Sequence, residues 1–248
     1  MLKKGPMMLA MAFCAISPLA LQAAEGGAGW AYEGELGPEH WGDLSPDYVQ
    51  CKVGVNQSPI DIVAPLSADL PPLELDYQGQ SIDLVNNGHT AKVNVEPGNF
   101  LRVGGEAFEL LQFHIHVPSE HRINGKQFIM EVHYVHRDAQ GQLAVVAILF
   151  DEGENPPNLT KYIDSIPSEV NAPVSLKAPL AKMAIMEMDT DYYRYNGSLT
   201  TPPCSEGVRW FVLKNPGTIA AAQRDRFNEL IGDDARGPQP VNARPVLR

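Results

Sequence analysis

Residues 107–150 decide the fold, and they read AFELLQFHIHVPSEHRINGKQFIMEVHYVHRDAQGQLAVVAILF. Three runs in this stretch are rich in β-branched and aromatic residues, as strands are: Ala107–Val117, Gln127–Arg137 and Leu143–Phe150. The turn signals Asn124-Gly125 and Gln140-Gly141 separate them. Because each short turn folds the chain back, the stretch predicts neighbouring antiparallel strands.

Five of the seven histidines lie in this stretch, between residues 114 and 136. On a strand, residues two apart point to the same face, so His114 and His116 project together. On the returning strand His133 can approach that pair, whereas His136 points the other way. Three converging imidazoles that leave a fourth position open are typical of a catalytic zinc site.

Two other interpretations of these histidines remain open at this point. They can be ordinary polar residues on a solvated sheet face. The order His114-Ile115-His116 and then Glu120 also resembles the first motif of the cupin barrels, which bind iron or manganese through two histidines and a glutamate. That match is partial, because Phe108 stands where cupins have glycine and their Pro-x-Gly-x-x-His hairpin is absent.

Strand-like runs recur on both sides of this stretch, at Ser81–Val85, Ala91–Val95 and Val208–Leu213. Two helices are predicted, over Leu159–Val170 and over Thr218–Ile231. No linker, charge block or internal repeat interrupts the chain after Trp30. The pattern predicts one mainly β domain with a few peripheral helices.

Composition excludes several classes of protein. The 248 residues carry 19 Lys and Arg against 30 Asp and Glu, a net charge of −11, with no basic cluster. Nucleic-acid binding depends on clustered cations, so no nucleic-acid partner is expected. With 44% hydrophobic residues the chain can bury a core, and 21 Gly and 21 Pro, scattered along it, favour turns and short strands over long helices.

The first residues have the pattern of a secretory signal peptide. Lys3 and Lys4 precede an apolar run that is too short to anchor the chain in a bilayer, and the small residues Ala23-Ala24 follow it. We therefore expect residues 1–23 to be removed, residues 24–248 to form the mature domain, and the protein to be periplasmic or secreted with no membrane anchor after cleavage.

Export also bears on the cysteines. Cys14 would leave with the signal peptide, and Cys51 and Cys204 would remain as an even pair in an oxidising compartment. This favours a disulfide between them over two unrelated buried thiols.

Several separated motifs recur in one order and resemble the α-class carbonic anhydrases, most of all the bacterial exported members. The similarity covers essentially all of residues 30–248, and its motifs are Gly37-Pro38-Glu39-His40-Trp41, Gln57-Ser58-Pro59-Ile60-Asp61, Asn86-Asn87-Gly88-His89, Gln112-Phe113-His114-Ile115-His116, Pro118-Ser119-Glu120-His121, Glu131-Val132-His133, Asn196-Gly197-Ser198-Leu199-Thr200-Thr201-Pro202-Pro203 and Asn242-Ala243-Arg244-Pro245. The resemblance implies a single catalytic domain on a large, mostly antiparallel central sheet.

The resemblance also implies an activity. His114, His116 and His133 would bind Zn²⁺, and zinc-bound hydroxide would attack carbon dioxide and give bicarbonate and a proton, reversibly. Thr200 would accept the hydrogen of that hydroxide and donate its own to the carboxylate of Glu120.

The resemblance also implies roles for residues around the metal. Gln112 and Glu131 would each hold a ligating ring, and a backbone carbonyl near Asn242 would hold His116. His89 would shuttle the proton to solvent, with Tyr32, Asn87 and Thr201 ordering the connecting waters. The apolar wall that receives carbon dioxide would be formed by Val135, Val145, Leu199 and Trp210, with Thr201 in the same pocket.

Lys92 departs from the family pattern, which usually has a neutral amide there. We expect this cation to lower slightly the pKa of His89 or of the zinc-bound water. A competing function is that of a catalytically silent relative that binds a protein or glycan partner, although this chain retains the histidines, Glu120 and Thr200. The sequence leaves the oligomeric state open, a homodimer included.

Overall fold

The computed structural model describes residues 29–154, 157–182 and 184–248. The predicted signal peptide and Cys14 lie outside these ranges. The strands are β1 (Asp61–Ile62), β2 (Glu74–Asp76), β3 (Ser81–Asn86), β4 (Ala91–Val95), β5 (Phe100–Val103), β6 (Glu106–His116), β7 (Arg122–Ile123), β8 (Lys126–Gln127), β9 (Met130–Arg137), β10 (Leu143–Glu152), β11 (Val174–Ser175), β12 (Tyr192–Ser198), β13 (Glu206–Leu213) and β14 (Gly217–Ile219). The α-helices are α1 (Trp41–Leu44), α2 (Gln50–Val53), α3 (Pro157–Asp164) and α4 (Ala221–Leu230), and the short 3₁₀ helices are η1 (Gly34–Leu36), η2 (Pro46–Tyr48), η3 (Leu180–Lys182) and η4 (Ala184–Glu187).

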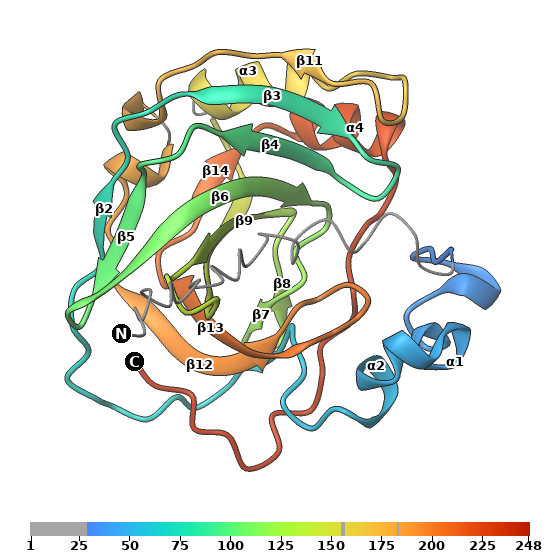
Figure 1. Cartoon of the computed structure of the whole chain (residues 1–248), viewed down its shortest axis with the longest axis vertical. Coiled ribbons are helices and arrows are strands. Elements are labelled where there is room, and N and C mark those ends of the chain that lie inside the picture. The colour runs from blue at the N-terminus through green and yellow to red at the C-terminus, as the bar shows by residue number, and fades with distance from the viewer. Residues whose placement is uncertain (1–28, 155–156, 183) are drawn as a thin grey trace, which may run out of the picture.

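An 11-stranded sheet dominates the molecule (Figure 1). Its main path runs β11-β3-β4-β6-β9-β10-β13-β12, with β5 on β6, β2 on β5 and β14 on β10. As predicted, β6, β9 and β10 are antiparallel neighbours at its centre. The pairs of β10 with β13 and with β14 are parallel, so the sheet is mixed.

Both predicted helices are shorter than expected. The run Leu159–Val170 contains Pro167, which cannot sit in a helix interior, and α3 ends at Asp164. The prediction that Thr218 opens a helix is wrong, because Gly217–Ile219 pair with the end of β10 as β14. A Cβ at Gly217 would lie 2.6 Å from the Phe150 ring, so this glycine permits the close approach of the two strands.

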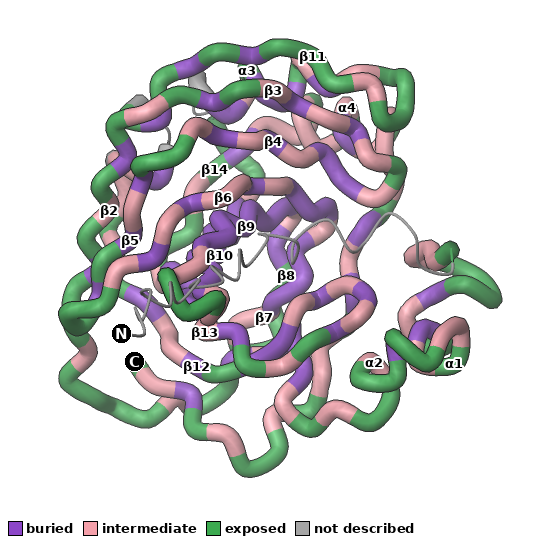
Figure 2. Tube along the Cα trace, viewed as in Figure 1, coloured by how far each residue is buried: buried purple, intermediate pink, exposed green. Residues whose placement is uncertain are grey.

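The two faces of the sheet carry different cores. The larger core gathers buried residues of β3, β4, β6, β9 and β10, among them Phe113 and Tyr134, and Phe227 of α4 packs with them. The smaller core lies on the opposite face and includes Val145 and Trp210. Figure 2 shows the consequence, a band of buried chain along β9 and β10 at the centre of the molecule. Both faces of β9 and β10 are therefore buried, whereas Gln112 and His114 on β6 stay half-buried.

A disulfide joins Cys51 to Cys204 across 153 positions of sequence, as predicted. It fastens the N-terminal segment with α1 and α2 to the loop that follows β12. No helix in the described ranges has the length and apolar character needed to span a bilayer.

Candidate metal centre

Strand register brings the three predicted ligands together. His114 on β6 pairs directly with His133 on β9, and His116 pairs with Glu131. Residues directly opposite one another share a face, so all three imidazoles lie on the face of the smaller core. Their ligand atoms lie within 4.8 Å of one another.

Each imidazole has one ring nitrogen engaged by an acceptor. His114 Nδ1 donates to Gln112 Oε1 at 2.9 Å, and His133 Nε2 donates to Glu131 Oε1 at 2.7 Å. His116 Nδ1 donates to a backbone carbonyl at 2.7 Å. These contacts fix the tautomers, so the lone pairs of His114 Nε2, His116 Nε2 and His133 Nδ1 are left for a ligand.

The carbonyl that holds His116 belongs to Asp234, and its prediction near Asn242 is wrong. The Asp234 carboxylate also accepts from the backbone N–H of Val117, which ties this segment to the end of β6. Asn242 is exposed, and its side-chain amide donates to the Val55 carbonyl instead. The family resemblance predicted the right kind of contact but placed it eight positions too far along the chain.

The environment favours neutral imidazoles at two of the three positions. Burial lowers the pKa of His114 well below its ordinary value, and the neighbouring His116, His133 and Lys92 lower it further. Burial also lowers the pKa of His133, against the carboxylate of Glu131. Burial acts in the same direction on His116, but the nearby carboxylates of Glu120 and Asp234 outweigh it and raise the pKa of that ring.

The free nitrogens fit a transition metal. His116 Nε2 is buried and has no hydrogen-bond partner, an arrangement that costs free energy unless a ligand occupies it. Three imidazole nitrogens suit zinc, and an open fourth position suits a catalytic rather than a structural site. A second cluster, His121 with Glu131 and His133, is a hydrogen-bonded network, since Glu131 Oε1 accepts from both rings.

Glu120 lies beside this centre. Its Oε1 accepts from the backbone N–H of Arg236 at 2.9 Å, and its Oε2 lies 3.6 Å from His116 Nε2. The expected hydrogen bond from Thr200 to Glu120 is not formed, because Oε2 has no hydrogen-bond partner. Thr200 is nevertheless buried, in a loop closed by the bond from Cys204 N–H to the Thr201 carbonyl.

His89, the predicted proton shuttle, packs against an aromatic cluster. The His89 ring stacks on Trp30, with centroids 3.7 Å apart, and Tyr32 meets Trp30 edge-on. Burial lowers the pKa of His89. The effect of Lys92 on the pKa of His89 or of the zinc-bound water stays a prediction. Asn87 Oδ1 accepts from the backbone N–H of both His89 and Thr90 and so shapes the turn that presents the ring.

The predicted apolar wall forms one cross-strand row next to the imidazoles. Val135 pairs with Val145, and Val145 pairs with Trp210. All three are buried in the smaller core, and Leu199 packs against it. Thr201 is half-buried in the loop beyond Leu199.

Sequence reasoning assigned no role to several buried polar residues around the centre. His121 Nδ1 donates to Glu131, and its Nε2 accepts from the Tyr195 hydroxyl at 2.7 Å. Arg236 is 2% exposed and donates to Gln57, to Ser58 and to the carbonyl of Cys51. The signal available for His121 was its place beside Glu120 in the same motif, whereas the place of Arg236 depends on tertiary contacts.

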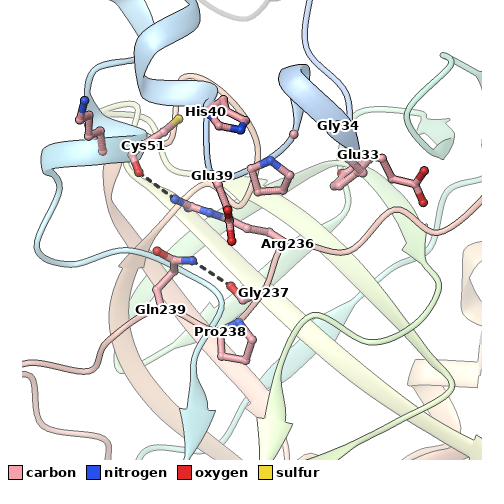
Figure 3. Close-up of a pocket in the computed structure, with 13 residues that line it drawn as sticks. Glu33, Gly34, Glu39, His40, Cys51, Arg236, Gly237, Pro238 and Gln239 are labelled. Atoms are coloured by element: carbon pink, nitrogen blue, oxygen red, sulfur yellow. Dashed lines mark hydrogen bonds between the residues drawn. The ribbon is translucent and has the colours of Figure 1, made fainter.

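A cavity of about 680 Å³ lies apart from the imidazoles, between the N-terminal segment and residues 236–239 (Figure 3). Its lining includes Tyr32, His40, Lys52 and Arg236, and none of the three clustered histidines. Arg236, which belongs to this lining, connects the cavity to the metal centre, because its backbone N–H donates to Glu120.

A three-imidazole centre with one apolar side and a buried carboxylate defines a catalytic zinc site. A family model described as eukaryotic-type carbonic anhydrase matches residues 36–248. A carbonic anhydrase of Pectobacterium carotovorum is 46% identical over 219 residues, which cover 88% of this chain and 90% of that protein.

Solved structures agree with this match. The α-carbonic anhydrase of Photobacterium profundum is 49% identical with a TM-score of 0.83, over 89% of this chain and 100% of that one. The enzyme of Thermovibrio ammonificans, in complex with sulfanilamide, is 44% identical with a TM-score of 0.84, over 90% and 100%. The chain belongs to the α-class carbonic anhydrases. It is a carbonic anhydrase with a histidine cluster typical of the family's zinc site, and the cupin-like alternative is wrong.

Proposed function

We propose that His114, His116 and His133 hold the zinc ion and that the residues around them divide the reaction between an apolar and a polar side. The observation that carries this proposal is the set of three lone pairs within 4.8 Å, each aimed by an acceptor on the far nitrogen of its ring. A zinc ion held by these residues would lower the pKa of a coordinated water, to the value of about 7 already known for carbonic anhydrases, and would supply a nucleophile at neutral pH.

Carbon dioxide is apolar, so it is received by an apolar surface. Val135, Val145 and Trp210 offer that surface, with Leu199 and Thr201 at its edge. Glu120 offers a buried carboxylate oxygen without a partner on the same side as His116 Nε2. The Thr200 hydroxyl, buried in the adjoining loop, does not contact this acceptor in the structure and would have to reach it to orient the attacking group.

The proton released by the reaction leaves through His89. Its ring is half-buried on Trp30, and its lowered pKa favours release of the proton to buffer. Tyr32 and Asn87 flank this route, Tyr32 through the aromatic cluster and Asn87 through the turn that holds the ring.

Metal analysis combined with stopped-flow carbon dioxide hydration tests this proposal. We expect one zinc per chain and fast turnover, both lost in His116→Ala, whereas His40→Ala, an exposed histidine outside the centre, retains both. Stoichiometric zinc without turnover would instead indicate a binding protein built on the same fold, and iron in place of zinc would contradict the proposal.

Residues 1–23 are proposed to be a signal peptide and the mature protein to be periplasmic or secreted. The Cys51–Cys204 disulfide supports this, because disulfides persist in oxidising compartments. N-terminal sequencing of the protein from a periplasmic fraction should give a first residue at or next to Ala24, and an intact Met1 in the cytosolic fraction would contradict export.

A further inference from the structure

A cross-strand row carries a lysine to the edge of the metal centre. Lys92 on β4 pairs directly with His114 on β6, His114 pairs with His133 on β9, and His133 pairs with Ala147 on β10. Side chains opposite one another on adjacent strands share a face and lie about 4.5–5.5 Å apart at Cβ. The Lys92 ammonium group therefore lies on the face of the imidazoles.

No counter-ion neutralises this lysine. Among the described residues, no carboxylate oxygen lies within 4.0 Å of Lys92 Nζ, whereas the amino groups of Lys52, Lys126 and Lys214 all have one. The acidic residue on the neighbouring strand, Asp83, accepts from Asn94 Nδ2 at 2.7 Å. The charge of Lys92 is thus available to a ligand.

This side of the centre is also its open side. His114 and Lys92 are half-buried, whereas His116 and His133 are each 1% exposed. The far side is closed by the apolar row with Val135 and Trp210. A neutral substrate and a charged product can therefore contact different parts of the site.

We infer that Lys92 recruits small monovalent anions to the open side of the histidine cluster, with bicarbonate as the physiological one. This inference rests on the proposed function, since bicarbonate is the charged partner of that reaction. Carbon dioxide carries no charge and gains little from an ammonium group, whereas an anion between Lys92 and a metal held by the imidazoles is attracted by both. Lys92 is in this way a specificity-determining residue for the charged partner.

Anion binding to the zinc-loaded protein tests the inference. Calorimetric titration with thiocyanate gives a dissociation constant without turnover, and inhibition by nitrate, a planar monovalent oxyanion like bicarbonate, gives a second value. For Lys92→Gln we expect both constants to rise about three- to tenfold, the size expected when one charge near a protein surface is removed. The Michaelis constant for carbon dioxide should change less than twofold.

Two variants serve as controls. Lys92→Arg keeps the charge and should keep thiocyanate binding within twofold of the unmodified protein. Lys161→Gln makes the same charge change at an exposed position of α3, across the sheet, and should leave binding unchanged. If Lys92→Gln does not fold, Lys92→Met replaces it, because the aliphatic stem is retained.

Unchanged constants in Lys92→Gln, or an equal rise in Lys161→Gln, would overturn the inference, the second because it would indicate an effect of net charge alone. The outcome is separable from a failure of the proposed function. Absence of carbon dioxide hydration in the unmodified protein would remove that function, while the thiocyanate comparison requires only bound zinc.

Discussion

His133 and His136 stand three residues apart on β9 and point to opposite faces of the same sheet. Both are buried. His136 has both ring nitrogens engaged: Nδ1 donates to the Ala144 carbonyl at 3.2 Å, and Nε2 accepts from the Tyr77 hydroxyl. His133 has one nitrogen held by Glu131 and the other facing the metal centre. Burial is common to the two, so a free and oriented lone pair is what distinguishes the proposed ligand from the structural residue.

The largest expected effect separates these two histidines directly. His133→Ala should lose stoichiometric zinc and reduce carbon dioxide hydration to the uncatalysed rate, because one of three ligands is removed. His136→Ala should keep one zinc per folded chain, since its ring faces the other core. The zinc content of the purified, folded proteins checks both expectations. Loss of zinc in His136→Ala would contradict the distinction between a ligand and a structural histidine.

The next effect is on stability in acid. Burial lowers the pKa of His136 to about 4, from an ordinary value of 6.5, so the folded state holds this ring neutral. Its contribution is complete above pH 6.5 and is lost as the pH falls towards 4, because the unfolded chain binds the proton first. The loss amounts to about 3 kcal/mol over that interval.

Urea unfolding at pH 7 and at pH 4.5 measures this loss. His136→Gln removes the titrating group, and the free energy of unfolding should fall less between the two pH values than it does in the unmodified protein. If the free energy of unfolding falls equally in the two proteins between pH 7 and pH 4.5, the acid sensitivity belongs to other groups.

A smaller effect is expected from substitution of Glu131, which orients the His133 ring. The Glu131 carboxylate also accepts from His121 and from the backbone N–H groups of Glu120 and His121. Glu131→Gln removes the charge that holds the ring and should weaken zinc binding about 10- to 100-fold. Competition with a chelator measures the dissociation constant, and Glu74→Gln on exposed β2 is the matched control. An unchanged constant would show that ring orientation does not depend on this charge.

The smallest effect concerns the face of β9 opposite the metal centre. Tyr77→Phe removes the donor to His136 Nε2 and leaves a buried acceptor unpaired, which should cost about 1–3 kcal/mol of unfolding free energy. Zinc affinity should not change. A shift in zinc affinity would mean that the two faces of β9 are coupled through the strand.

The ligands could be predicted from sequence because they obey a local rule. His114, His116 and His133 are placed by the period of two along strands and by the antiparallel pairing of β6 with β9, and Gln112 and Glu131 follow from the same period. The Asn124-Gly125 turn that was expected to fold the chain back lies between β7 and β8, inside the longer connection from β6 to β9. The disulfide followed from an even count of cysteines. Each of these inferences needs only the order of residues within or between adjacent elements.

The other features of the fold and the site depend on contacts between residues far apart in the sequence, which a local pattern does not predict. The His116 ring is held by a backbone carbonyl 118 positions away, and any residue type could have supplied it. Thr218 failed as a helix start because Gly217 can approach the Phe150 ring, a tertiary contact that outweighs the capping signal. The role of Arg236 was missed for the same reason, since its partners Gln57 and Glu120 come from distant segments.

The contact between Asp234 and His116 has a consequence for how the metal centre is completed. The acceptor of the His116 ring lies 118 positions further along the chain, so this ring is oriented only once that late segment has packed against the end of β6. The same late segment supplies the backbone N–H of Arg236 to Glu120. Pairing of the strands alone therefore does not complete the metal centre, which also requires the contacts from Asp234 and Arg236.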